Sequence, residues 1–241
     1  MRYYRDGQVV EKAFLDDYAF TAMALLDLYE ATFDVKWLIE AKSLSNQMIE
    51  LFADTETGGF FLAGKDSEEL IARTKPGSDG AIPSGNSVAA LVLLKLGRLT
   101  MDQHFTELGG NVLETFSQQL EQSPAYSSAM LSALDFRLGP AQEIIIAGNA
   151  DAPDVKKMLK LIHGTFLPNA VVLLHEPDKA DSALYKTVPF IKNQTAIDGK
   201  ATAYICENYA CKKPVNNVGE FEDLLAGTAA KSGGGNPIKG Q

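Results

Sequence analysis

The hydrophobic positions of the first 140 residues recur at helical spacing, which predicts a series of α-helices. The first is expected over 14–33, and a second follows the cap Asp34 and ends near Ala53. A third follows Ser84 and ends near Arg98. Very short connections between successive helices favour antiparallel hairpins. Further helices are expected over 102–122, capped by Asp102 and weakened in the middle by Gly109 and Gly110, and over 124–136.

The stretch DGAIPSGNSVAALVLLKL, residues 79–96, combines a turn with an almost entirely apolar helix. A helix that is apolar on every side must be buried on every side. We therefore expect Leu91→Asp to unfold the chain, because it would place an unpaired charge in the core. The polar residues Asp79, Ser84, Asn86 and Ser87 gather at the N-terminus of this helix, beside backbone N–H groups that lack intrahelical partners. This end of the helix is the first candidate for a polar site.

Two shorter stretches carry weaker patterns. Residues 1–12 are polar and are expected to be extended or frayed. Residues 58–64 and 69–75 are short segments flanked by glycine or charge, which favours a small two-stranded hairpin between helix pairs.

The pattern changes at Gly139 and Pro140, where a β-branched strand, QEIIIAG, begins a strand–helix–strand sequence. This spacing predicts a βαβ unit with parallel strands. A further strand in KATAYICEN and a closing helix in VGEFEDLLAG follow. The sequence thus predicts a helical region over 1–139, a small α/β region over 140–228 and a disordered tail over 229–241.

The net charge of −9 is confined to the helical region. Residues 1–140 carry 11 Lys/Arg and 20 Asp/Glu, whereas residues 141–241 carry 11 of each. Neither part has the basic excess that nucleic-acid binding requires, and no apolar run is long enough for a membrane span. The first residues lack the apolar core of a signal peptide, so a cytoplasmic location is expected.

Cys206 and Cys211 are separated by four residues, which fits neither a CxxC redox motif nor a complete zinc site. Two buried thiols are therefore expected rather than a disulfide, and no metal. No GxGxxG motif follows the first strand of the α/β region, so no dinucleotide cofactor is expected.

Four segments carry a family resemblance: FLDDYAFTAMALLDLYEATFD, GGFFLAGKDSEELIARTK, DGAIPSGNSVAALVLLKLGRLT and AYICENYACKKPV. Over roughly residues 5–226 the chain resembles the C-terminal part of the thioredoxin-domain-containing spermatogenesis-associated protein family. The resemblance implies an (α/α)6 toroid similar to those of N-acylglucosamine 2-epimerase and six-hairpin glycosidases. This chain shows no thioredoxin domain and too few helices to close the ring. The expected fold is therefore mainly α, with antiparallel helical hairpins of an incomplete toroid followed by the small α/β region.

The resemblance places residues 15–19 and 79–87 near the mouth of the toroid. Asp17 and Asp79 are the candidate catalytic pair, because two carboxylates can perform acid–base chemistry on a sugar. The candidate ligand-binding residues are Asp16, Tyr18, Ser84 and Asn86. Helix capping is the alternative role for the same side chains. Asp79→Asn is accordingly expected to abolish ligand stabilisation and leave the fold nearly intact.

Two functions follow as hypotheses. The first is binding or processing of a small polyhydroxylated, carbohydrate-like ligand, of isomerase, epimerase or hydrolase type. The second is a non-catalytic scaffold or assembly module, in which a homodimer or a partner chain supplies the missing hairpins. The first hypothesis depends on fold analogy, which does not by itself imply function.

Overall fold

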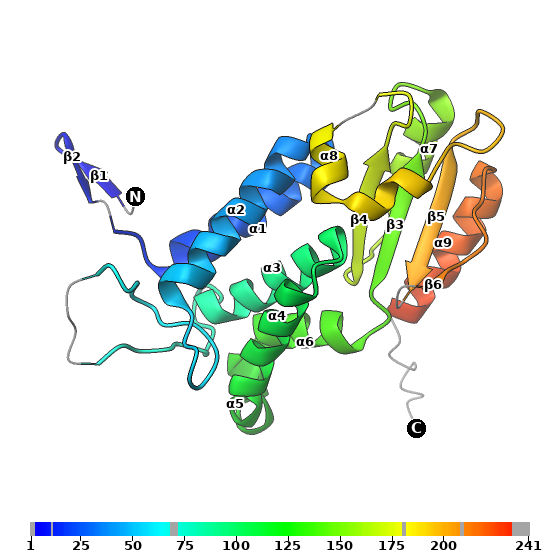
Figure 1. Cartoon of the computed structure of the whole chain (residues 1–241). Helices are drawn as coiled ribbons and strands as arrows, with labels where there is room; N and C mark the ends of the chain where they lie inside the picture. The colour runs from blue at the N-terminus through cyan, green and yellow to red at the C-terminus, as the bar shows by residue number, and fades with distance from the viewer. Residues whose placement is uncertain (1–2, 11, 68–71, 180–181, 208–209, 233–241) are drawn as a thin grey trace, which may run out of the picture. The chain divides into compact units, whose positions relative to one another are not determined.

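The computed structural model describes residues 3–10, 12–67, 72–179, 182–207 and 210–232. The chain divides into two compact units, Met1–Arg137 and Leu138–Gln241 (Figure 1). Each unit is described by itself. Helices predominate in the first, and the second is built on a small four-stranded sheet.

Four long helices form the body of the first unit. They are α1 (Leu15–Thr32), α2 (Val35–Phe52), α3 (Gly85–Thr100) and α4 (Gln103–Thr115). Helix α1 packs against α2, α3 packs against α4, and α1 also packs against α3. The helices predicted at these positions are confirmed.

The same two-residue connector joins both helix pairs. Phe33 and Met101 end α1 and α3 in the left-handed backbone region, with φ of 54° and 55°. Each is followed by an aspartate that caps the next helix. Asp34 accepts the backbone N–H of Lys36, and Asp102 accepts that of His104. A left-handed residue followed by a capping side chain reverses the chain direction with few residues.

Helix α4 is shorter than predicted. It ends at Thr115, and α5 (Ser117–Gln122), a 3₁₀ turn (Pro124–Tyr126) and α6 (Ser128–Leu138) follow. The break is not at the glycines. A β-carbon on Gly109 would lie 2.8 Å from the Leu94 side chain, so this glycine allows α3 and α4 to approach closely.

The burial predicted for α3 is confirmed at every position except Leu91 and Lys95. Val92, Leu93 and Leu96 are fully buried, while Leu91 is partly exposed. A substitution at Leu93 therefore tests the burial of α3 more directly than one at Leu91.

The extended conformation predicted for the start of the chain is confirmed in its described residues, but the pairing of two segments was not predicted. Strands β1 (Tyr3–Arg5) and β2 (Gln8–Val10) form a short antiparallel hairpin. Its turn is Asp6–Gly7, with φ of 51° and 79°, as a two-residue type I′ turn requires. The hairpin predicted over 58–75 contains no strand in its described residues, although the Leu62 N–H donates to the Thr74 carbonyl at 2.8 Å. Residues 68–71 of that prediction lie outside the described residues.

The second unit contains a sheet with the strand order β4-β3-β5-β6. Strand β3 (Gln142–Ala147) is parallel to β4 (Ala170–His175) and antiparallel to β5 (Thr202–Glu207). Helix α7 (Pro153–His163) connects the parallel pair and packs against β3 and α9 (Val218–Ser232). The predicted βαβ unit is confirmed. The sequence did not predict α8 (Ser182–Thr187) or the 3₁₀ turn Pro189–Asn193.

The expected pair of buried thiols is wrong, because Cys206 and Cys211 form a disulfide. The chain returns along β5 as a two-residue edge strand, β6 (Ala210–Cys211), and the register places the two cysteines opposite each other. Cys206 is buried and Cys211 is exposed. The tail expected from residue 229 overlaps α9, which runs to Ser232, and residues 233–241 lie outside the described part of the chain.

Leu93→Ala should lower the free energy of unfolding of the helical unit by about 3 kcal/mol, because it leaves a cavity in the middle of α3. Trp37, the one tryptophan of the sequence, lies in α2 and reports this unit by its fluorescence during urea denaturation. Leu28→Ala is the matched control, since Leu28 is 42% exposed, and it should cost less than about 1 kcal/mol. Equal losses in the two variants would contradict the burial of α3.

Candidate functional site

The carboxylate of Asp79 is held by three hydrogen bonds at the start of α3. One oxygen accepts the backbone N–H of Ser84 at 2.9 Å and the hydroxyl of Ser87 at 2.8 Å. The other accepts the backbone N–H of Ala129 at 2.8 Å. The backbone N–H of Asp79 donates to the Tyr126 carbonyl. Asp79 thus links its own loop to the first turn of α3 and to the start of α6.

Ser84 and Asn86 are also engaged in bonds within the fold. Ser84 is the N-cap of α3, as predicted, and its hydroxyl accepts the Ser87 N–H at 3.1 Å. Asn86 is fully buried. Its side chain accepts the Phe60 N–H at 2.8 Å, and it donates to the carbonyls of Phe60 and Pro76, both at 2.9 Å. The amide therefore ties two loop segments to the helix.

The candidate residues of α1 lie at the first turn of that helix. Asp17 accepts the backbone N–H of Phe14 at 2.8 Å, which closes the helix start. The Tyr18 ring packs edge-on against Phe52, with centroids 5.2 Å apart. Asp16 lies beside Gly85, where a β-carbon would collide with its carboxylate. The structure thus brings Asp16 to the same helix end as Asp79 and Ser84, while Asp17 and Asp79 each serve in a separate cap.

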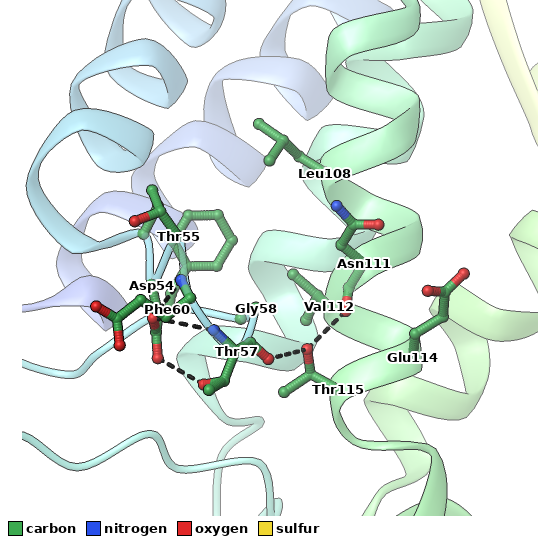
Figure 2. Close-up of a pocket in the computed structure, with 13 residues that line it drawn as sticks. Asp54, Thr55, Thr57, Gly58, Phe60, Leu108, Asn111, Val112, Glu114 and Thr115 are labelled. Atoms are coloured by element: carbon green, nitrogen blue, oxygen red, sulfur yellow. Dashed lines mark hydrogen bonds between the residues drawn. The ribbon is translucent and has the colours of Figure 1, made fainter.

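A cavity of about 520 Å³ opens between the loop that follows α2 and one side of α4 (Figure 2). Its volume is in the range of small-molecule sites. The apolar part of its lining is supplied by Ala53, Phe60, Leu108 and Val112. The polar part is supplied by Asp54, Thr55, Glu56, Thr57, Asn111, Glu114 and Thr115, with Gly58 and Gly59 completing the loop.

The loop over residues 54–59 is built around the carboxylate of Asp54. One oxygen accepts the backbone N–H groups of Glu56 and Thr57, at 2.9 and 3.3 Å. The other accepts the Thr57 hydroxyl and the Lys75 ammonium, each at 2.7 Å. The bond from Lys75, assisted by those from Thr57 and Glu56, holds the pKa of Asp54 well below its usual range.

The loop is docked against α4 at Thr115. The hydroxyl of this residue donates to the carbonyls of Asn111, at 2.7 Å, and Thr57, at 3.3 Å. Gly58 and Gly59 have φ of 78° and 70°. A β-carbon on Gly58 would collide with the Thr115 hydroxyl, so both backbone conformation and space require glycine there.

The sequence did not predict this cavity. The sequence predicts only that a helix ends near Ala53, and the ammonium that organises the loop after it is 21 residues away from Asp54. The connection to the predicted site is Asn86, which holds Phe60 in the cavity wall through its two hydrogen bonds.

The three histidines differ in environment. His104 and His163 are exposed, whereas the imidazole of His175 is buried. Its Nδ1 lies within hydrogen-bond distance of the Gln194 carbonyl, and its Nε2 is 3.0 Å from the Tyr185 hydroxyl. The described residues contain no group of three or more His, Cys, Asp or Glu side chains arranged to hold a metal ion.

These features define a mainly helical unit with a polar cavity, followed in the chain by a small α/β unit. The sequence is similar to spermatogenesis-associated protein 20. The rat protein is 36% identical over 213 residues and the human protein 35%, and each match covers 88% of this chain. An uncharacterized protein of Caenorhabditis elegans, B0495.5, is 26% identical over 216 residues.

The chain spans 27% of the length of the rat and human relatives, which is consistent with its matching the C-terminal part of a larger protein. No protein-family model matches the chain. Within the described ranges, none of the helices combines the length and the apolar character that crossing a bilayer requires.

The three hydrogen bonds of the Asp79 carboxylate change the outcome expected of Asp79→Asn, which the sequence alone predicted to leave the fold nearly intact. Because the amide nitrogen of asparagine cannot accept a hydrogen bond, the substitution should destabilise the helical unit by about 1–3 kcal/mol. Asp27→Asn, on the exposed side of α1, is the control and should change stability by less than about 0.5 kcal/mol. Urea denaturation followed by Trp37 fluorescence measures both. An Asp79→Asn variant as stable as the parent protein would show that the network carries little of the fold.

Proposed function

We propose that this chain binds a small polyhydroxylated, carbohydrate-like ligand in the cavity between residues 53–60 and α4. The composition of the lining is the observation that supports this proposal. Hydroxyl, amide and carboxylate groups surround an apolar patch to which the partly exposed Ala53 and Leu108 contribute, with the buried Phe60 and Val112 beneath it. Sugars present the same combination, with hydroxyls at the rim and C–H groups on the ring face, and such sites orient a ligand through a few polar groups.

Asn111 and Glu114 are the proposed ligand contacts on α4. Both side chains are exposed, and both belong to the cavity lining (Figure 2). An amide offers both donors and acceptors, and a carboxylate accepts strong hydrogen bonds from hydroxyls. Asp79 and Asn86 act indirectly in this proposal, since they hold the elements that form the cavity.

The proposal is a binding function. A reaction of isomerase, epimerase or hydrolase type would require acid–base groups at the ligand. Asp17 and Asp79 already accept backbone hydrogen bonds in their own caps. Of the carboxylates that line the cavity, that of Asp54 is likewise engaged within its loop and with Lys75, so Glu56 and Glu114 would be the first to replace in a test for catalysis.

Neutral monosaccharides and polyols should raise the melting temperature of the helical unit, as followed by Trp37 fluorescence. A ligand at 100 times its dissociation constant adds about 2.7 kcal/mol of stability. Asn111→Ala should weaken that ligand about tenfold or more by removing its hydrogen bonds. Gln118→Ala, at an exposed position of α5, should leave binding unchanged.

The panel should include the phosphorylated form of each sugar. Since three carboxylates line the cavity, a phosphate is expected to weaken binding. Absence of stabilisation by every compound up to its solubility limit would contradict the proposal, as would a ligand that binds the Asn111→Ala variant with unchanged affinity.

A second proposal is a non-catalytic assembly module that pairs with another chain carrying further helical hairpins. The observation that favours it is a pair of exposed apolar side chains, Ile82 at 63% and Tyr126 at 67%. They belong to the two segments that Asp79 joins through its bonds to Tyr126 and Ala129. Apolar side chains that a partner covers belong to such interfaces when they form a contiguous patch. If the chain associates with another copy through these residues, light scattering should give a molar mass above that of one chain. Replacing both residues with serine should then restore the mass of a single chain.

A further inference from the structure

The ammonium group of Lys75 is surrounded by oxygen atoms of the 54–58 loop. Its nitrogen lies 2.7 Å from the Asp54 carboxylate and 2.9 Å from the Gly58 carbonyl, and it also donates to the Thr57 hydroxyl. An ammonium has three donors, so each of the three is used. The face of the Phe61 ring is also near the ammonium, with its centroid 5.4 Å from the nitrogen.

This arrangement has the composition of a cation site. A carboxylate, a hydroxyl and a backbone carbonyl converge on one point, as oxygen ligands do around a hard cation. The aromatic face adds the attraction of its π-electrons for positive charge. The two charged side chains are largely shielded, with relative exposures of 20% for Lys75 and 10% for Asp54.

The loop that carries these oxygens forms one wall of the cavity. Asp54, Thr57 and Gly58 belong to the lining, and Gly58 abuts Thr115 on α4. Lys75 comes from a separate segment, residues 72–78, which has no helix or strand of its own. The loop continues into two left-handed glycines, Gly58 and Gly59. Fixing these flexible residues in one conformation costs conformational entropy, which the bonds from Lys75 help to offset.

We infer that residues 54–58 form a cation cage whose occupant is the chain's own Lys75 ammonium, and that Lys75 is the positioning residue of the cavity wall. Removing the ammonium would leave the Asp54 carboxylate without its counter-ion and the carbonyl of Gly58 without its donor. The loop would then open, and the cavity would lose its wall without any change in the ligand contacts on α4.

The test is Lys75→Met, which keeps an apolar stem of similar length and removes the charge. Hydrogen exchange of the amides of Glu56, Thr57 and Gly58, measured by mass spectrometry of the peptide that contains them, should become about tenfold faster. Lys65→Met, at an exposed position of the same loop region, is the control and should not alter this exchange. The readout requires no ligand, so the inference and the proposed carbohydrate binding can fail independently.

Chemical rescue separates a cation cage from a merely structural lysine. Methylammonium added to Lys75→Met should restore slow exchange, because it supplies both charge and N–H donors. Tetramethylammonium should not, since it has the same charge and no donor. Unchanged exchange in Lys75→Met, or equal rescue by the two salts, would overturn the inference. If Trp37 fluorescence shows that Lys75→Met is unfolded, Lys75→Ala is used, which also lacks a donor and leaves more room for the added ammonium, with each salt present during refolding and the same criteria.

The pH dependence of the parent protein gives a second test. Because hydrogen bonds from Lys75, Thr57 and Glu56 lower the folded-state pKa of Asp54, its contribution to stability is present above its unfolded pKa of about 4 and is lost as pH falls through the folded value. Loop exchange, corrected for its intrinsic pH dependence, should accelerate in that acid range. Asp54→Asn should remove this dependence. Acid acceleration of equal size in Asp54→Asn would assign the effect to another group and count against the cage.

Discussion

The buried amide of Asn86 is the interaction on which the arrangement of the helical unit depends. It is fully buried and makes three hydrogen bonds, two to Phe60 and one to Pro76. These backbone groups lie in irregular segments, where no helix or sheet satisfies them. A buried unpaired backbone group costs about 1–3 kcal/mol, so the amide fixes the position of both segments relative to α3. The loop that lines the cavity is held in place through Phe60.

The apolar character of α3 makes this use of polar residues necessary. A helix that is buried on all sides brings its N-terminal N–H groups into the interior, where each needs an acceptor. The Ser84 hydroxyl accepts the Ser87 N–H and Asp79 accepts the Ser84 N–H, and Asp79 extends the network to Ala129. The polar residues at this end therefore have a sufficient role in the fold, and a ligand need not be invoked to explain why they are there.

Sequence rules predicted the features that depend on interactions between residues close together in the chain. The caps Asp34 and Asp102 and the apolar positions of α3 were visible in the sequence because each acts within a few residues. The Asp6–Gly7 turn was equally local and was missed although its composition is typical of a hairpin. By contrast, Lys75 and Asp54 are far apart in sequence, and Cys206 meets Cys211 only through the register of a two-residue strand. Such pairings depend on tertiary structure.

A lysine in a cation cage differs from a bound metal in one physical respect. A covalently attached ammonium is always present, so occupancy of the cage does not vary with the concentration of an ion, and its local concentration is set by the chain. The ammonium is compact and has three donors, which suits three convergent oxygens better than the planar guanidinium of arginine would. The cavity wall of this protein is therefore ordered by folding itself, and any ligand meets a site whose polar groups are already oriented.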